Sequence, residues 1–143
     1  MSLIKVEVIK GKKAIQITGP LRIEVFEHEQ GFVDEFDDLD EASVHAIIYE
    51  DKQVIASGRM YEEHPQVYHL GRIVVKKEKR GQGYGQRIVN ELVNHAIQQG
   101  GKQCVLSSQT HACRFYETCG FRQEGPVYLD QNQPHQWMVK DII

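Results

Sequence analysis

Apolar and polar residues alternate in short segments along the first third of the chain. Residues 4–8 alternate with the period of a strand that has one face on a core. After Gly19-Pro20, residues 21–26 predict the start of a helix, because proline is favourable in a first helical turn. The acidic segment 34–41 is expected to lie at the surface. It is either a solvated patch or a site that attracts a cationic acceptor.

Three strand candidates come next, at residues 45–50, 54–61 and 67–75. Asp51-Lys52 makes a short turn between the first two, which predicts an antiparallel hairpin. The third candidate ends in the apolar run Ile73-Val74-Val75, and such a run indicates a strand that is buried on both faces.

The strongest helical pattern lies in the second half of the chain. Apolar residues repeat there at the three-and-four spacing of one helical face, at Ile88, Val89, Leu92, Val93, Ala96 and Ile97. Gly100-Gly101 ends this helix. The remaining segments predict a buried strand at 103–108, a short helix at 112–119, and closing strands at 121–129 and 136–142. This order predicts a mixed α/β layer, in which residues 1–143 form a single domain.

A cationic stretch and a glycine-rich loop precede this helix. Residues 76–80 carry four cations, and Gly81-Gln82-Gly83-Tyr84-Gly85 runs from them straight into the helix. Glycines let the backbone approach a ligand closely, and the unpaired N–H groups of a first helical turn bind phosphate. The loop lacks the Gly-Lys-Ser/Thr ending of a P-loop and the G-x-G-x-x-G spacing of a dinucleotide site. Taken alone, it is either another kind of phosphate site or a plain turn.

Two motifs together resemble those of the GNAT superfamily of N-acetyltransferases. The first is Arg80-x-x-Gly83-x-Gly85 after an apolar strand, and the second is Ala112-x-x-Phe115-Tyr116-x-x-x-Gly120-Phe121. The resemblance extends from Leu21 to Met138. It implies the α/β (α+β) GNAT fold, with a mixed and mostly antiparallel central sheet of about seven strands, flanked by helices and splayed at an acetyl-CoA cleft.

Within the superfamily, the chain resembles the small YjcF/ElaA-like branch. The residues that carry this likeness are Leu21-Arg22, Val25-Phe26, Glu29-Gln30, Asp37, Asp40, His45, Gln109, Pro134-His135 and Met138.

The resemblance implies that acetyl-CoA binds as co-substrate between the strand that ends at Val75 and the strand at Val105. Its pantetheine arm would pair with the backbone of Ile73 and Val75, and its pyrophosphate with the amides of the glycine loop. The residues expected at the cofactor are Ile73, Val74, Val75, Arg80, Gly81, Gln82, Gly83, Tyr84 and Gly85.

The resemblance also implies an acid and a base. Tyr116 would protonate the CoA sulfur; the alternative is that Tyr116 and Phe115 are both packing residues. His135 stands where the related glyphosate N-acetyltransferase has its base, and histidine titrates near neutral pH. Its alternative is a structural histidine bonded to the backbone. A water chain is another source of proton transfer, and the other candidate side chains are Glu29, His45 and His111.

Two arginines resemble residues that bind acceptor anions in the same relative. Arg22 and Arg72 occupy these positions, and arginine forms bidentate pairs with carboxylates and phosphates. Gln109 stands where the relative has a further arginine, which argues against a strongly anionic acceptor. The alternative is that either arginine pairs with Glu29 or with the acidic segment.

Composition and charge limit the classes of partner that the protein is expected to bind. The 143 residues carry a net charge of −3 with scattered Lys and Arg, unlike a dedicated nucleic-acid binder. Cys104, Cys113 and Cys119 are expected as reduced thiols, and neither they nor the histidines have the paired spacing of a metal site. Because the chain shows no signal-peptide or membrane-helix pattern, a cytoplasmic location with no membrane partner is expected.

These observations together predict an acetyl-CoA-dependent N-acetyltransferase. The enzyme would move an acetyl group directly to a primary amine of a small molecule or peptide. The alternative from another class is a non-catalytic acyl-CoA-binding or sensing module with the same fold. A homodimer is consistent with the many dimeric relatives.

Overall fold

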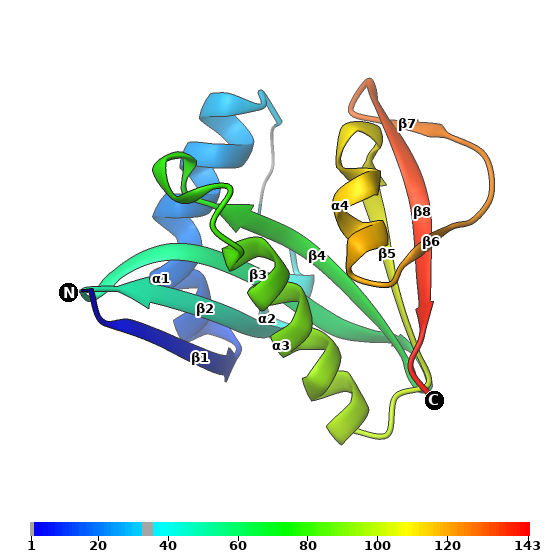
Figure 1. Ribbon diagram of the computed structural model, residues 1–143, viewed down its shortest axis with the longest axis horizontal. Coiled ribbons are helices and arrows are strands. Elements are labelled where there is room, and N and C mark those ends of the chain that lie inside the picture. Colours follow the sequence, from blue (N-terminus) through cyan, green and yellow to red (C-terminus); the bar gives the residue numbers. More distant parts are fainter. Residues whose placement is uncertain (1, 33–35) are drawn as a thin grey trace.

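An open sheet organises the molecule (Figure 1). Its strands are β1 (Ile4–Lys10), β2 (Val44–Glu50), β3 (Gln53–His64), β4 (Val67–Val75), β5 (Gln103–Gln109), β6 (Arg122–Gln123), β7 (Tyr128–Asp130) and β8 (Gln133–Asp141). The computed structural model describes residues 2–32 and 36–143, so Asp34 lies outside the described residues. The described strands follow the order β1-β2-β3-β4-β5-β8-β6, and β7 pairs with β8. All pairs are antiparallel except β4–β5, which confirms the mixed, mostly antiparallel sheet.

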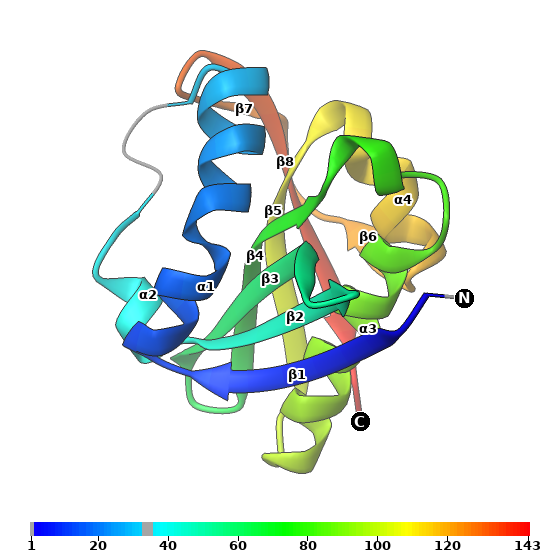
Figure 2. The ribbon, with the colours of Figure 1, turned by 90° about the vertical axis from the view of Figure 1, so that its left-hand side faces the viewer.

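Helices cover both faces of the sheet. They are α1 (Lys12–Arg22), the π-helix η1 (Ile23–Glu29), α2 (Leu39–Ala42), the 3₁₀ turns η2 (Lys77–Lys79) and η3 (Thr110–Ala112), α3 (Tyr84–Gln98) and α4 (Cys113–Thr118). Helix α1 lies on one face and α3 on the other (Figure 2). Among the described helices, none combines the length and the apolar character that crossing a bilayer requires.

Strand β4 is enclosed from both sides, as its apolar end predicts. Val74 packs with Leu21 and Val25 on the side of α1. Its neighbours Ile73 and Val75 point the other way and pack against the core under α3. Alternating side chains of one strand therefore contribute to two separate apolar clusters.

Helix α3 confirms the helical face predicted from the sequence. The apolar positions from Ile88 to Ala96 are buried against β2, β3 and β4. Ile97, at the edge of this face, remains exposed. The helix therefore fixes the glycine loop at its N-terminus relative to the sheet.

The first helix begins earlier than the sequence predicts. It starts at Lys12 rather than at residue 21, and Pro20 lies inside it. Ala14, Thr18, Leu21 and Val25 are buried at spacings of four, three and four residues, so one helical face continues through the proline. Pro20 itself is exposed, and the backbone then widens into the π-helix η1. Burial of the continuous face thus outweighs the boundary signal of Gly-Pro.

The strand predicted at 121–129 is also interrupted. Arg122–Gln123 pairs with β8 as β6, and Tyr128–Asp130 pairs with it again as β7. Between them lies Gly125, with φ 78°, followed by Pro126, which has no N–H group to donate to a ladder. These two residues turn the chain away from β8 before β7 returns to it.

The sheet opens between β4 and β5. Within these two strands, both described in full, pairing runs from Val67↔Gln103 to His69↔Val105 and stops there. Beyond His69 the strands diverge (Figure 1). A β-bulge lies in the diverging part of β4, where Arg72 and Ile73 together oppose Gly58 of β3. The expected splay is therefore confirmed.

Gly58 permits close packing at this bulge. A Cβ atom there would lie 2.7 Å from Ile88 Cγ2, 3.2 Å from Ile73 Cγ1 and 3.3 Å from Leu92 Cδ1. We predict that Gly58→Ala lowers the free energy of unfolding by about 1–3 kcal/mol, because α3 must move away from the sheet. Urea unfolding measures the loss. Gly71→Ala is the matched control, since its Cβ would meet nothing within 4 Å; an equal loss in both variants would contradict the packing argument.

Candidate active site

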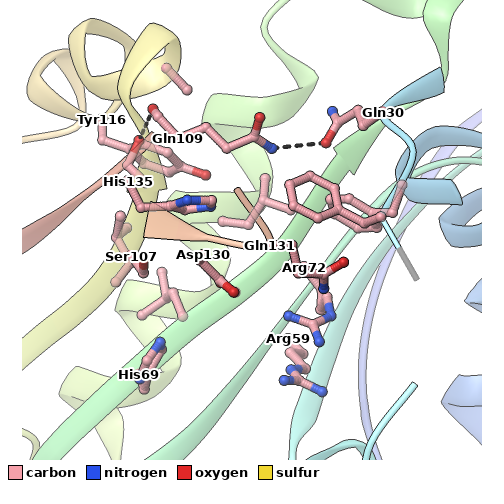
Figure 3. A pocket seen from close by; sticks show the side chains of 18 of the residues that line it. Gln30, Arg59, His69, Arg72, Ser107, Gln109, Tyr116, Asp130, Gln131 and His135 are labelled. Carbon is pink, nitrogen blue, oxygen red and sulfur yellow. Dashed lines mark hydrogen bonds between the residues drawn. The ribbon is translucent and has the colours of Figure 1, made fainter. Parts of the chain in front are cut away.

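A cavity of about 380 Å³ lies where β4 and β5 separate (Figure 3). Strands β3, β4, β5 and β8 and the helices at both sides contribute to its walls. The side chains that line it and enter the argument below are Gln30, Arg59, His69, Arg72, Gln109, Tyr116, Asp130 and His135. The splay thus brings Arg72, Gln109, Tyr116 and His135 together, although they are far apart in the sequence.

The glycine loop has the backbone geometry of a phosphate site. Gly81 and Gly83 have φ values of 77° and 88°, which favour glycine, and Gly83 is the N-cap of α3. In the described chain, neither a backbone carbonyl nor a capping side chain accepts from the amides of 81–86. The helical ladder begins with the Arg87 N–H donating to Gly83 O at 3.0 Å. These unpaired amides and the helix dipole suit the pyrophosphate of a CoA thioester.

The third glycine of the loop, Gly85, allows α3 to pack closely against α4 and β4. Gly85 lies in the first turn of α3, and a Cβ there would be 3.2 Å from Phe115 Cζ and 3.5 Å from Val75 Cγ2. Phe115 of α4 therefore rests directly on the start of α3. The two sequence motifs meet at this contact, which sets the glycine loop relative to α4 and Tyr116.

Arg80 connects this loop to other elements through its side chain. Its Nε donates to Val75 O at 3.0 Å, and its Nη2 lies 3.0 and 3.1 Å from the carboxylate oxygens of Glu29. Lys79 forms an ion pair with Glu50. Glu29, a candidate base from the sequence, is thus engaged at the end of η1.

Tyr116 lies in the cavity wall between two aromatic rings. Phe115 is 5.0 Å away and Phe121 6.2 Å away, both edge-on. Burial, and then the nearby thiols of Cys119 and Cys113, raise the pKa of Tyr116 well above its usual 10. Tyr116 is therefore protonated at neutral pH, and its ring packs between Phe115 and Phe121 in the cavity wall.

His135 is buried at the start of β8, and its ring is held on three sides. Its Nδ1 lies 2.8 Å from Gln133 O, and because a carbonyl only accepts, Nδ1 carries the proton. Tyr128 stacks on the ring and Phe32 meets it edge-on. The structural contact that the sequence offered as an alternative is therefore present. It also leaves Nε2 as the basic nitrogen, on a side chain that lines the cavity.

Gln109 and Gln30 span the cavity (Figure 3). Gln109 Nε2 donates to Gln30 Oε1 at 2.8 Å, and His111 Nε2 lies 3.1 Å from Gln109 Oε1. Gln30 follows Glu29 in the chain, so the end of η1 contacts both β5 and the glycine loop. These contacts narrow the access to the cavity between the two sides of the splay.

A buried ion network underlies the β3–β4 wall of the cavity. Asp40 receives Arg22 Nη1 at 2.7 Å and Arg59 Nη1 at 2.9 Å. Asp37 binds Arg59 at 2.7 and 3.1 Å and Arg72 at 3.4 Å. Arg22, expected at the acceptor, is only 1% exposed and lies outside the cavity lining. Both arginines thus contact the acidic segment, the alternative that the sequence left open.

Asp40 corrects the expectation that the acidic segment is solvated. It is 1% exposed. Burial alone raises its pKa, but the hydrogen bonds from Arg22, the Asp37 backbone and Arg59 outweigh that effect and lower the pKa to about 2. His45, a candidate base, donates from Nε2 to the backbone carbonyl oxygen of Asp40, 2.9 Å away. Burial lowers the pKa of His45, which lies apart from the cavity.

Sequence reasoning missed several cavity residues, among them Arg59, His69 and Asp130. Arg59 is 4% exposed within the apolar strand β3, and an isolated charge in an otherwise apolar strand was the available signal. His69 Nδ1 lies 3.0 Å from Glu63 Oε1 and 3.2 Å from Tyr61 Oη, and its ring stacks on Tyr61. The described residues contain no group of three or more side chains suited to a metal ion.

Known proteins share this architecture. The chain matches the Acetyltransferase (GNAT) domain family over residues 14–142. It is 30% identical over 141 residues to the uncharacterized N-acetyltransferase YjcF of Bacillus subtilis (strain 168), covering 96% of this chain and 100% of YjcF. An acyl-CoA N-acyltransferase from Pseudomonas aeruginosa superposes with a TM-score of 0.86 at 26% identity, over 96% of this chain and 99% of that one. Escherichia coli ElaA shares the fold, with a TM-score of 0.84 at 21% identity over 96% and 99%.

The splayed sheet, the glycine loop and these matches define an acyltransferase. The chain belongs to the GNAT acetyltransferase family, and its relatives include the YjcF branch expected from the sequence. Members of this family use acetyl-CoA as the acyl donor.

We predict that the ionisation of Asp40 contributes to stability above pH 4. Its pKa is about 2 in the folded chain and 3.8 ordinarily, so the contribution is complete above pH 4 and is lost as pH falls from about 4 to about 2. The shift corresponds to roughly 2 kcal/mol. Urea unfolding of the wild type and Asp40→Asn across pH 2–7 measures it.

The difference in the free energy of unfolding between the wild type and Asp40→Asn should be largest at pH 7, where the substitution removes the carboxylate that pairs with Arg22. This difference should decrease toward pH 2. Asp38→Asn, an exposed change of the same charge in the same segment, should follow the wild type throughout. A difference in the free energy of unfolding that stays constant across the pH range would contradict the assigned role of Asp40.

Proposed function

We propose that the protein is an N-acetyltransferase that moves the acetyl group of acetyl-CoA directly to a primary amine of a small acceptor. The observation that carries the proposal is the cavity at the β4–β5 splay, which is lined by both Tyr116 and His135. The α3 amides lie at the open end of the same splay. A proton donor, a proton acceptor and an anion-binding loop thus meet around one cleft.

The residues proposed to hold acetyl-CoA are those of β4 and the glycine loop. Backbone groups of Ile73 and Val75 would pair with the pantetheine arm, because the part of β4 beyond His69 has no β5 partner in these fully described strands. The amides from Gly81 to Gly85 would bind the pyrophosphate. When bound, acetyl-CoA supplies an activated acyl group as a thioester.

His135 is the proposed base. With Nδ1 donating to Gln133 O, its Nε2 lone pair is available to an acceptor in the cavity. An ammonium that enters the cavity gives one proton to Nε2, and the resulting amine can attack. The nitrogen–carbon bond to the acetyl group forms as the carbon–sulfur bond breaks.

Tyr116 is the proposed acid. It gives the hydroxyl proton to the departing sulfur, and the second proton that the nitrogen loses restores the hydroxyl. Because burial raises the pKa of Tyr116, its hydroxyl stays protonated at neutral pH and can donate to the sulfur as negative charge develops there. The protons removed from nitrogen and the proton given to sulfur therefore balance.

Direct transfer is favoured over an acetyl-cysteine step. Burial raises the pKa of Cys104 to about 11 and also raises the pKa of Cys119, so both are poor nucleophiles at neutral pH. Cys113 is buried, and none of these three lies in the cavity lining among the described residues.

A thiol-release screen tests the proposed function. Purified protein, acetyl-CoA and a library of primary amines, amino acids and short peptides are mixed, and free CoA thiol is measured. Release that depends on one or more amines, with the acetylated amine found by mass spectrometry, is the expected result. Binding of acetyl-CoA without release by any amine would contradict the proposal.

We predict that Tyr116→Phe lowers kcat by about 100-fold, within the usual range for loss of a general acid. The affinity for acetyl-CoA should change less than twofold, because the ring still packs between Phe115 and Phe121. Steady-state kinetics and calorimetric titration measure the two quantities. Phe115→Leu is the control for packing without loss of a hydroxyl. Weaker acetyl-CoA binding with normal kcat would contradict the acid role.

We predict that His135→Ala removes the ascending limb of the pH–rate profile for kcat/KM, because no neutral imidazole then forms as pH rises. Gln136→Ala, the neighbouring buried position on β8, should keep that limb. An unchanged limb in His135→Ala would exclude this histidine as the base.

A further inference from the structure

Asp130 enters the cavity from a tight hairpin that the proposed chemistry leaves unused. It pairs with Gln133 at the end of β7, and the two residues between them, Gln131 and Asn132, have φ values of 48° and 62°. Two successive positive φ angles are the signature of a two-residue hairpin turn whose twist matches the strands. The backbone that carries Asp130 is therefore well defined.

The Asp130 carboxylate faces the cavity (Figure 3). Within the described part of the chain, no hydrogen bond or ion pair holds this carboxylate, whereas Asp37 and Asp40 are each held by arginines. An ionised carboxylate that lines a cavity attracts a cation. His135 is linked to Asp130 through the hairpin. Asp130 pairs with Gln133, and the backbone carbonyl of Gln133 accepts the hydrogen bond from His135 Nδ1.

Cations occupy the other side of the cavity. Arg59 of β3 and Arg72 of β4 both line it, and Figure 3 shows Arg72 and Asp130 extending into the same space from β4 and from the hairpin. Arg72 lies in the β-bulge with φ 53°, a left-handed conformation that few residues with a side chain adopt. The ion pair with Asp37 helps to fix its guanidinium in place.

We propose that the acceptor is a small zwitterion, an amino-acid-like compound that carries both the amine and a carboxylate. Asp130 anchors the ammonium beside His135, and Arg72 binds the carboxylate across the cavity. This inference rests on the proposed function and adds a specificity-determining residue to it. The cavity, at about 380 Å³, is in the range of small-molecule sites, and the Gln30–Gln109 bridge restricts access for a folded protein surface.

Matched pairs of amines provide the test. Each pair contains an L-amino acid and the amine that differs from it by loss of the carboxylate: leucine and 3-methylbutylamine, phenylalanine and 2-phenylethylamine, lysine and pentane-1,5-diamine. CoA thiol release gives kcat/KM for each. The wild type should favour the amino acid of at least one pair by tenfold or more. Equal values, or a preference for the simple amine in every pair, would overturn the inference and leave the proposed function intact.

Two variants test separately how the ammonium and the carboxylate of the acceptor are recognised. Asp130→Asn should raise KM about tenfold for both members of the favoured pair, with kcat changed less than threefold. Arg72→Gln should raise KM for the amino acid alone and so abolish the preference. Asp38→Asn, outside the cavity lining, is the charge-matched control and should resemble the wild type. An Asp130→Asn enzyme with wild-type KM would overturn the role of Asp130.

Binding separates this inference from the proposed function. If no amine releases thiol, the proposed function fails. Saturation-transfer NMR with the same amino acids and amines then tests whether the cavity still binds a zwitterion. Amino acids that bind the wild type, bind Asp130→Asn at least tenfold more weakly and bind better than the matched amines would support the zwitterion site. Absence of binding by every amino acid would overturn it.

Discussion

The interruption of hydrogen bonding between β4 and β5 is the constraint on which the site depends. Three residue pairs join the strands, and the bulge at Arg72 and Ile73 then turns β4 away. A continuous ladder would fill the cleft with backbone bonds and leave no unpaired strand for a CoA arm. The close fit of Gly58 under α3 keeps the bulge against the core. Every proposed functional group borders this opening or the loop at its end.

Charge, together with apolar packing, fixes the wall of the cavity formed by β3 and β4. Asp40 joins Arg22 of α1 to Arg59 of β3, and Asp37 extends the network to Arg72. A buried carboxylate with two arginine partners keeps its charge because the partners outweigh the cost of desolvation. Several residues that link the chain to the YjcF/ElaA-like branch lie in this network. In this structure these residues support the cavity wall through their ion pairs.

Local patterns predicted most of the fold but few of the contacts in the site. The α3 face, the apolar strand β4 and the two motifs depend on near neighbours in the sequence, so their period and spacing sufficed. The helix through Pro20 was missed because its buried face outweighs a strong local boundary signal. The sequence offered pairing of Arg22 with the acidic segment only as an alternative, and the partners of Arg59 were beyond reach, since ion pairs across 18 and 19 residues leave no periodic trace. The family resemblance supplied the proposed roles of Tyr116 and His135, which no pattern within this chain determines.

The two sides of the cavity differ in how freely they can change, and this difference bears on acceptor choice. Replacing Arg59 or Asp40 breaks a buried ion network and reduces stability along with any change in binding. The hairpin of β7 and β8 is held by its own ladder and has exposed side chains at Val127 and Leu129. A substitution at Asp130 therefore alters the charge of the cavity without disturbing a buried contact. Because the proposed CoA loop relies on main-chain amides, a GNAT fold of this kind can keep its donor while the hairpin adapts to a different amine.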